Sequence, residues 1–370
     1  AKVIQNREAV HPGTYIGKGK IEEVASLLRA LDANGVICDD ELSPAQLNNL
    51  ERELDCKVMD RTLLILDIFA GRAVSSEGKI QVELAQLRYR AARLVGLRES
   101  LSRLGGGIGT RGPGEKKLET DRRLIRTRIS ALKAELAQVE KHRELIRGKR
   151  SRGNLKTAAI VGYTNAGKST LLNTLTGAGI LAEDKLFATL DPTTRVLELK
   201  DGQQILLTDT VGFIRKLPHH LVEAFKSTLE EAKYADYIIH VVDASNPQAE
   251  LQMFTVYETL RELGATGKKI VTLLNKQDQV TGSGIRDLKA DYTVKCSART
   301  GEGLDEFKNV LAKLLAEDQI YLEELYPYSE AGKIQKIREF GTLLSEEYRE
   351  DGIFVKARVP AEIFVSVMPK

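Results

Sequence analysis

The chain has 370 residues, 42% of them apolar and 29% charged, with a formal net charge of +3, and this length favours two or three domains over a single core. The longest apolar run, LLILDIFAG from Leu63, is interrupted by Asp67 and is shorter than the roughly 20 residues of a membrane-spanning helix. No secretory signal opens the chain and its three scattered cysteines form no CxxC pair, so we expect a cytoplasmic protein without a membrane span or a disulfide framework.

Residues 1–78 are predicted to form a small α/β domain. The strand-like stretches TYIG, VICD and KVMD alternate with the helical patterns IEEVASLLRAL and SPAQLNNLEREL. Ser43 is placed to cap the second helix, with Pro44 at its first position. Strands that alternate with helices favour a parallel sheet.

Residues 79–152 are predicted to form an antiparallel helical hairpin with a basic surface. This segment carries 20 Lys and Arg against 8 Asp and Glu, a local net charge of +12, which favours a polyanionic partner. A solvated helix pair that happens to be basic is the alternative. Apolar residues recur every three or four positions, as in two helices packed along a shared seam: Ile80, Leu84, Leu87, Ala91, Leu94 and Leu101, then Ile125, Ile129, Leu132, Leu136, Val139 and Ile146.

A glycine-rich tip, residues 105–114, joins these two helices. It contains Gly107-x-Gly109-x-x-Gly112, which has the spacing of a dinucleotide-binding fingerprint. That fingerprint needs a strand before it, whereas a helix pattern leads into this one. We therefore do not assign a dinucleotide to the tip.

Residues 153–317 are predicted to form a P-loop domain. The stretch TAAIVGYTNAGKSTLLNTLTG places Gly162-x-x-x-x-Gly167-Lys168-Ser169 between a buried strand and a helix, as a phosphate-binding loop requires. Backbone N–H groups and the helix N-terminus can then face the phosphates. We expect Lys168 to reach the β- and γ-phosphates and Ser169 to ligate Mg²⁺. The predicted loop comprises Gly162, Tyr163, Thr164, Asn165, Ala166, Gly167, Lys168, Ser169 and Thr170.

Three further motifs, each at a strand end, indicate that the nucleotide is GTP. LLTDTVGF supplies an aspartate for Mg²⁺ and a glycine N–H for the γ-phosphate. In LLNKQD, the Asp278 carboxylate can accept from the guanine N1–H and 2-amino groups, and adenine presents neither donor. The backbone of KCSART can meet the guanine O6. The residues assigned to this site are Asp209, Gly212, Asn275, Lys276, Asp278, Ser297 and Ala298.

A switch loop is expected at DPTTRV, residues 191–196, between the P-loop and DTVG. A threonine there can complete the Mg²⁺ shell only while a γ-phosphate is bound, which produces an order–disorder switch. We favour Thr194 over Thr193 for this role and rank Thr189 third. The predicted metal ligands are therefore Ser169, Thr194 and Asp209.

The residue after DTVG is Phe213, where Ras-like proteins place a glutamine that orients the attacking water. A protein that binds GTP without hydrolysing it is one reading, but the other parts for phosphoryl transfer are intact. Asn165 is similar to the P-loop asparagine of GTPases that recruit K⁺ beside the phosphates, and a simple turn role for it stays equally open. The candidate catalytic residues are Lys168, Thr194, Gly212 and Asn165.

Residues 318–370 are predicted to form a small α+β segment, with a helix near Ala331–Glu347 followed by the strand-like stretches GIFVKARV and EIFVSV. The whole chain is thus predicted to be a multidomain α/β protein. Its expected parts are the N-terminal parallel α/β domain, the helical hairpin, the GTPase domain and this C-terminal segment.

The motifs GYTNAGKSTLLNTLTG, LFATLDPTTR, DTVGFIRKLPHHLVEAFKSTLEE and RLGGGIGTRGPGEKKLETDRR resemble those of the HflX family, in the Obg–HflX group of GTPases. The resemblance covers nearly the whole chain through about residue 316. It implies an Mg²⁺-dependent GTPase that binds the large (50S) ribosomal subunit and splits stalled or idle ribosomes. It also implies that the hairpin reaches 23S rRNA near the peptidyl-transferase centre, and we expect a monomer. Phe213 fits the family, which carries a hydrophobic residue there.

The resemblance suggests that the glycine-rich tip is an RNA-binding element. Glycines allow close backbone approach to phosphate and ribose, and flanking cations supply charge. A linker without contacts is the alternative reading of the tip. For the whole chain, the alternative is a non-enzymatic, nucleotide-gated RNA-binding or ribosome-assembly protein. The candidate RNA-binding residues are Arg103, Gly105, Gly106, Gly107, Gly109, Arg111, Gly112, Gly114, Lys116, Lys117, Arg122 and Arg123.

Overall fold

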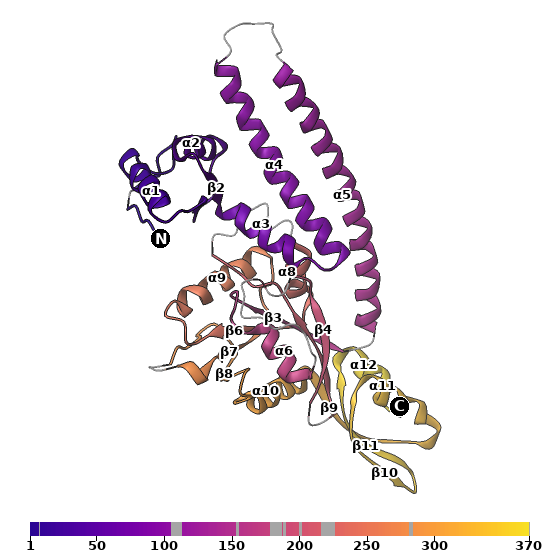
Figure 1. Ribbon diagram of the computed structural model, residues 1–370. Coiled ribbons are helices and arrows are strands. Elements are labelled where there is room, and N and C mark those ends of the chain that lie inside the picture. Colours follow the sequence, from indigo (N-terminus) through magenta and orange to yellow (C-terminus); the bar gives the residue numbers. More distant parts are fainter. Residues whose placement is uncertain are drawn as a thin grey trace. The chain divides into compact units, whose positions relative to one another are not determined.

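The structure is a computed structural model that describes residues 1–6, 8–104, 113–152, 155–177, 187, 190–199, 202–215, 226–280 and 284–369. Within helices, the side chains of 95–104, 113–118, 142, 144, 146–152, 226–228 and 362 fall outside this description. The chain divides into two compact units (Figure 1). Unit 1 comprises Ala1–Lys141 and Lys216–Lys226, and unit 2 comprises His142–Arg215 and Ser227–Lys370.

The N-terminal part of unit 1 is the predicted small α/β domain. Two parallel strands alternate with three helices, in the order α1 (Lys18–Ala30), β1 (Gly35–Cys38), α2 (Pro44–Leu54), β2 (Lys57–Asp60) and α3 (Arg61–Arg72). Helix α2 begins as predicted, because the Ser43 hydroxyl accepts from the Gln46 N–H while the Gln46 side chain accepts from the Ser43 N–H. The prediction of a strand at TYIG is wrong. Only an isolated bridge between His11 and Tyr15 forms there, in a tight turn where Tyr15 has a φ of 64°.

Two long helices follow, α4 (Ser76–Leu104) in unit 1 and α5 (Pro113–Arg152), which belongs to unit 1 up to Lys141, and they run side by side in Figure 1. The expected seam holds where it is described, because Leu84 and Leu132 are buried. A two-pronged ion pair joins the helices across this seam, with Arg128 donating to the two carboxylate oxygens of Glu83 at 2.8 and 3.0 Å. These contacts confirm the hairpin.

A buried carboxylate connects the small α/β domain to α4. Asp60, at the end of β2, is fully buried and caps α3 by accepting from the Leu63 N–H at 2.8 Å. It also accepts from the Tyr89 hydroxyl at 2.8 Å and the Leu42 N–H at 3.2 Å, and it forms an ion pair with Arg93. The Arg93 guanidinium lies 3.2 Å from the centre of the Tyr89 ring. One aspartate thus fixes the start of α3, the loop at Leu42 and the middle of α4 together.

Unit 2 contains a six-stranded sheet in the order β4-β5-β3-β6-β7-β8, in which only the edge strand β4 is antiparallel. The strands are β3 (Lys156–Gly162), β4 (Thr193–Glu198), β5 (Gln204–Asp209), β6 (Tyr237–Asp243), β7 (Lys269–Asn275) and β8 (Tyr292–Lys295). The helices of this domain are α6 (Lys168–Thr176), α8 (Lys226–Tyr234), α9 (Ala249–Glu262), α10 (Leu304–Glu317) and the short η1 (Gln277–Gln279). The parallel strands are almost wholly apolar, as expected for strands buried on both faces.

The C-terminal segment of unit 2 is a three-stranded antiparallel sheet in the order β10-β11-β9. It runs β9 (Gln319–Tyr326), η2 (Tyr328–Glu330), α11 (Ala331–Phe340), β10 (Thr342–Arg349), β11 (Gly352–Pro360) and α12 (Ala361–Val367). The predicted α+β class is confirmed, and GIFVKARV is the strand β11.

Two predictions about this C-terminal segment are wrong. The helix expected over Ala331–Glu347 ends at Phe340, and β10 follows after Gly341. The stretch EIFVSV forms the helix α12, not a strand. Its β-branched residues favour a strand locally, but Pro360 precedes the helix and the apolar side of α12 packs into the core, where Val367 is buried.

Candidate nucleotide-binding site

The four sequence motifs meet at one edge of the unit 2 sheet. Strands β3, β5 and β7 end at Gly162, Asp209 and Asn275, and β8 ends directly before the stretch that contains Ser297. These strands are parallel, so their carboxyl ends lie at the same edge, where open α/β sheets bind ligands. The predicted loop from Gly162 to Thr170 therefore lies beside DTVG, NKQD and the Ser297–Ala298 backbone.

Two positions of the loop restrict the residue type. Gly167 has no space for a side chain, and both Gly167 and Asn165 have positive φ angles. A Cβ on Gly167 would lie 2.4 Å from the Asn275 Nδ2, and the φ of Gly167 is 95°. Asn165 has a φ of 63°, which asparagine tolerates better than most residues. This conformation agrees with a turn role for Asn165 and does not test the K⁺ prediction.

Lys168 begins α6 and its side chain is buried. Its ammonium donates to the carbonyls of Gly162 and Tyr163, at 3.3 and 3.0 Å. Burial lowers the pKa of Lys168 to about 8, although the nearby Asp209 carboxylate acts in the opposite direction. The Lys168 ammonium thus lies in the P-loop, where phosphate oxygens can pair with it.

Next to Lys168, the predicted Mg²⁺ ligands Ser169 and Asp209 are already together. The Ser169 hydroxyl donates to the Asp209 Oδ2 at 2.8 Å. A hydroxyl and a buried carboxylate are both oxygen ligands, the type that Mg²⁺ prefers. The chemistry of this pair thus fits the metal.

The residues predicted to recognise guanine form a connected network. Asn275 donates to the Ala166 carbonyl and accepts from the Ala298 N–H, both at 2.8 Å, so it ties the P-loop to the KCSART loop. The Ser297 hydroxyl donates to the Asp278 Oδ1 at 2.7 Å, and this bond lowers the pKa of Asp278. The Asp278 carboxylate is exposed, ionised and held in one orientation, ready to accept from a base.

The predicted switch threonine lies in a strand, not a loop. Thr194 belongs to β4 opposite Thr208, with the two hydroxyl oxygens 3.0 Å apart, and Thr193 pairs with Asp209. Thr189 lies outside the described residues. The role of Thr194 toward Mg²⁺ stays a prediction. Phe213 is buried against the P-loop, and its side chain offers no hydrogen bond to an attacking water.

Sequence reasoning missed Asp243 and Thr174, two residues that hold this network. Asp243, the last residue of β6, forms an ion pair of 2.7 Å with Lys276. The Thr174 hydroxyl donates to the Ala298 carbonyl at 2.8 Å, which ties α6 to the KCSART loop. Asp243 had a usable signal, since it is a carboxylate at the end of a buried strand, YIIHVVD.

Most candidate RNA-binding residues lie outside the described part of the molecule. Six of them belong to residues 105–112, which are not described: Gly105, Gly106, Gly107, Gly109, Arg111 and Gly112. The side chains at the ends of α4 and α5 are also not described, which covers Arg103, Gly114, Lys116 and Lys117. Arg122 is half-buried and Arg123 is exposed, both on α5.

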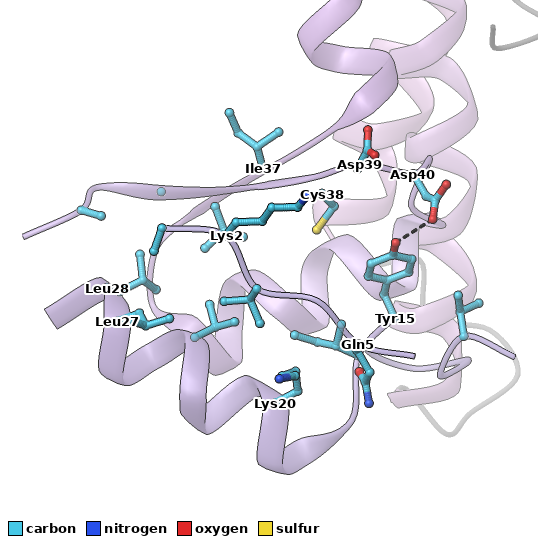
Figure 2. A pocket seen from close by; sticks show the side chains of 18 of the residues that line it. Lys2, Gln5, Tyr15, Lys20, Leu27, Leu28, Ile37, Cys38, Asp39 and Asp40 are labelled. Atoms are coloured by element: carbon cyan, nitrogen blue, oxygen red, sulfur yellow. Dashed lines mark hydrogen bonds between the residues drawn. The ribbon is translucent and has the colours of Figure 1, made fainter. Parts of the chain in front are cut away.

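A second cavity, of about 640 Å³, lies in the small α/β domain of unit 1 (Figure 2). Its walls include Leu27 and Leu28 of α1, and the Tyr15 hydroxyl donates to the Asp40 carboxylate at 2.7 Å on one side. It has carboxylates and apolar walls but not the glycine loop and strand ends of the nucleotide site.

Three protein families match the chain. They are described as GTP-binding GTPase N-terminal over residues 1–70, GTP-binding GTPase Middle Region over 72–150, and 50S ribosome-binding GTPase over 157–276. No helix in the described part of the chain is long and apolar enough to cross a membrane.

The chain is also similar to individual proteins. It is 70% identical to the GTPase HflX of Lacrimispora saccharolytica, over 99% of this chain and 87% of that protein. The GTPase HflX of Escherichia coli is 43% identical, over 96% of this chain and 84% of that protein. Among solved structures, a GTP-binding protein from the hyperthermophilic archaeon Sulfolobus solfataricus in complex with GDP is 28% identical. That match covers 83% of this chain and 88% of the archaeal chain, with a TM-score of 0.44.

Proposed function

The chain belongs to the HflX family of GTPases, and from this premise we propose that it binds the large ribosomal subunit and dissociates stalled or idle ribosomes in a cycle of GTP binding and hydrolysis. Family membership makes the chain a GTP hydrolase, so the non-enzymatic alternative is set aside. The ribosome as partner is supported by the match of residues 157–276 to the family of 50S ribosome-binding GTPases. A ribosomal partner also supports a cytoplasmic location.

The observation that carries the proposal is the convergence of phosphate, metal and base contacts at one sheet edge. We assign the β- and γ-phosphates to Lys168 and the P-loop amides, with the Gly212 N–H facing the γ-phosphate. The base lies against Asp278, which Ser297 already orients. Asp278 and the P-loop backbone are held by hydrogen bonds within the protein, so little ordering of these groups opposes nucleotide binding.

We assign Mg²⁺ to Ser169 and Asp209, and to Thr194 when GTP is bound. When bound, the ion neutralises charge that develops on the phosphates during transfer. The Thr194 hydroxyl lies 3.0 Å from the Thr208 hydroxyl, and its oxygen would be a third protein ligand of the ion. Because that contact would form only beside a γ-phosphate, Thr194 would respond to the presence of GTP.

Placement of the attacking water is left to groups other than Phe213. The Phe213 ring is buried and has no hydrogen-bonding atom, so water must be oriented by backbone groups, by a K⁺ ion near Asn165 or by the ribosomal partner. An arginine finger at the phosphates is worth roughly 10³–10⁵ in rate, and a K⁺ ion there would take its place. We therefore expect slow turnover alone and fast turnover on the ribosome.

The hairpin α4–α5 is assigned to 23S rRNA near the peptidyl-transferase centre. Its net charge of +12 suits a polyanion, and its glycine-rich tip suits the irregular surfaces of folded RNA. Nucleotide state would then control how firmly the protein holds the subunit.

The decisive experiment measures GTP turnover with and without purified large subunits, in K⁺ buffer and in Na⁺ buffer, alongside sedimentation of whole ribosomes into subunits. We expect turnover to rise on adding subunits, and whole ribosomes to separate when GTP is present. A rate that needs K⁺ would support an ion at Asn165. If large subunits leave the turnover rate unchanged, and the protein with GTP leaves whole ribosomes intact in sedimentation, the proposed function is wrong. Asp278→Asn is the matched variant, since it alters base recognition and leaves the basic hairpin intact.

A further inference from the structure

Thr164, in the P-loop, contacts both segments that are expected to respond to the γ-phosphate. Its backbone N–H donates to the Phe213 carbonyl at 2.8 Å, and Phe213 in turn donates to the Gly162 carbonyl at 3.0 Å. Its hydroxyl accepts from the Phe187 N–H at 3.0 Å, in the stretch that leads to DPTTR. Thr164, Phe187 and Phe213 are all buried.

These contacts hold DTVGF close against the phosphate-binding loop. A Cβ on Gly212 would lie 2.7 Å from the Thr164 Cα and 3.0 Å from the Lys168 ammonium. Gly212 and the Lys168 ammonium are therefore near neighbours, and a γ-phosphate that lies between them requires the two to separate. A nucleotide with two phosphates places no γ-phosphate there.

Tyr163 extends the same attachment beyond Phe213. It shares a parallel bridge with Phe213, and its hydroxyl accepts from the Arg215 N–H at 3.2 Å. A side chain of the P-loop thus follows the backbone of DTVGF for two further residues. Separation of Gly212 from the P-loop has to break or stretch this bond as well.

We propose that Thr164 and Tyr163 form a latch that holds DTVGF and Phe187 in the arrangement suited to GDP, and so set the preference between GDP and GTP. Both are positioning residues, because they act through Gly212 and not on the reacting atoms. The proposal rests on the roles of Lys168 and Gly212 given under the proposed function. It adds which side chains oppose the switch and in which direction they shift it.

The direction in which the GDP/GTP preference shifts depends on which nucleotide state contains these hydrogen bonds. A hydrogen bond present only in the GDP-suited arrangement lowers the free energy of that arrangement, and removing it lowers the cost of moving to the other. One such bond contributes enough to change an equilibrium by about two- to tenfold. The Thr164 hydroxyl and the Tyr163 hydroxyl each accept one such hydrogen bond.

The test uses three variants of the full chain. Thr164→Val keeps the shape and the backbone N–H but removes the hydroxyl acceptor for Phe187, and Thr164→Ser keeps that hydroxyl as the matched control. Tyr163→Phe removes only the acceptor for Arg215. For each, calorimetric titration with GDP and with a non-hydrolysable GTP analogue gives the ratio of the two affinities.

We expect the ratio to shift toward the GTP analogue by about two- to tenfold in Thr164→Val and in Tyr163→Phe, and to stay at the wild-type value in Thr164→Ser. A merely structural role would weaken both nucleotides together and leave the ratio unchanged, which overturns the latch, as does a shift toward GDP. If the wild-type chain binds neither nucleotide, the nucleotide site itself is wrong, and the latch with it.

Discussion

Replacing Asp60 with asparagine removes one charge from a fully buried carboxylate and little else. Asparagine keeps an acceptor for the Leu63 N–H, so the cap on α3 survives. Its amide nitrogen, however, takes the place of Oδ2. A donor then faces the Leu42 N–H and the Arg93 guanidinium, which are donors themselves. Removing one partner of a buried ion pair costs about 3–5 kcal/mol. We expect about 3 kcal/mol, the lower value, because part of the hydrogen bonding is kept.

Hydrogen exchange of the whole chain, followed by mass spectrometry, measures this loss where it occurs. In Asp60→Asn, amides of α3 are expected to exchange about 100-fold faster, and those of β3, β6 and β7 at the wild-type rate. The matched control is Asp39→Asn. It makes the same change in the ion pair between Asp39 and Arg61, in which the Asp39 side chain is 83% exposed. If Asp60→Asn changes exchange no more than Asp39→Asn does, the buried junction does not stabilise unit 1 and the reasoning is refuted.

Three more predictions concern the nucleotide and the RNA. Nucleotide affinity should fall as the pH rises past about 8, by up to about tenfold per pH unit, because burial lowers the pKa of Lys168 to about 8 and phosphates need its protonated form. Titrations with GDP on either side of that pH check this, and Lys168→Arg should show no such fall. Asp278→Asn should lower the preference for GTP over ATP at least about tenfold in competition binding, and an unchanged preference would contradict the assignment. Replacing Arg111, Lys116 and Lys117 with alanine should reduce the salt dependence of large-subunit binding by about two to three in logarithmic slope, whereas an unaltered slope would place them off the RNA.

The GTP site could be predicted almost completely from the sequence. Each of its motifs is a contiguous stretch at the end of a strand, so the local pattern fixes both the residue types and the side of the sheet on which they lie. The rule that parallel strands share an edge then brings Lys168, Asp209 and Asp278 together without further information. The seam of the hairpin was equally readable, because the 3.5-residue repeat is local.

The C-terminal segment shows where local patterns mislead. EIFVSV has the composition of a strand, yet it forms α12 because its apolar side is buried against the sheet that β9 and β11 build. Packing against distant residues outweighs a propensity difference of about 1 kcal/mol or less. The helix predicted over Ala331–Glu347 likewise ends at Phe340, and the residues from Thr342 onward form β10, which pairs with β11.

The sequence by itself determined the class of ligand and the stretches that we propose to bind phosphate and to select guanine, because each depends on a short stretch of backbone. Only the tertiary structure decided which side chains support them. Asn275 joins two loops that are 109 and 23 residues away, and Asp60 joins β2 to an arginine 33 residues on. Thr164 likewise meets Phe187 and Phe213 from a different loop. Such contacts depend on which strands are neighbours and how deeply each group is buried, and both are properties of the packed chain.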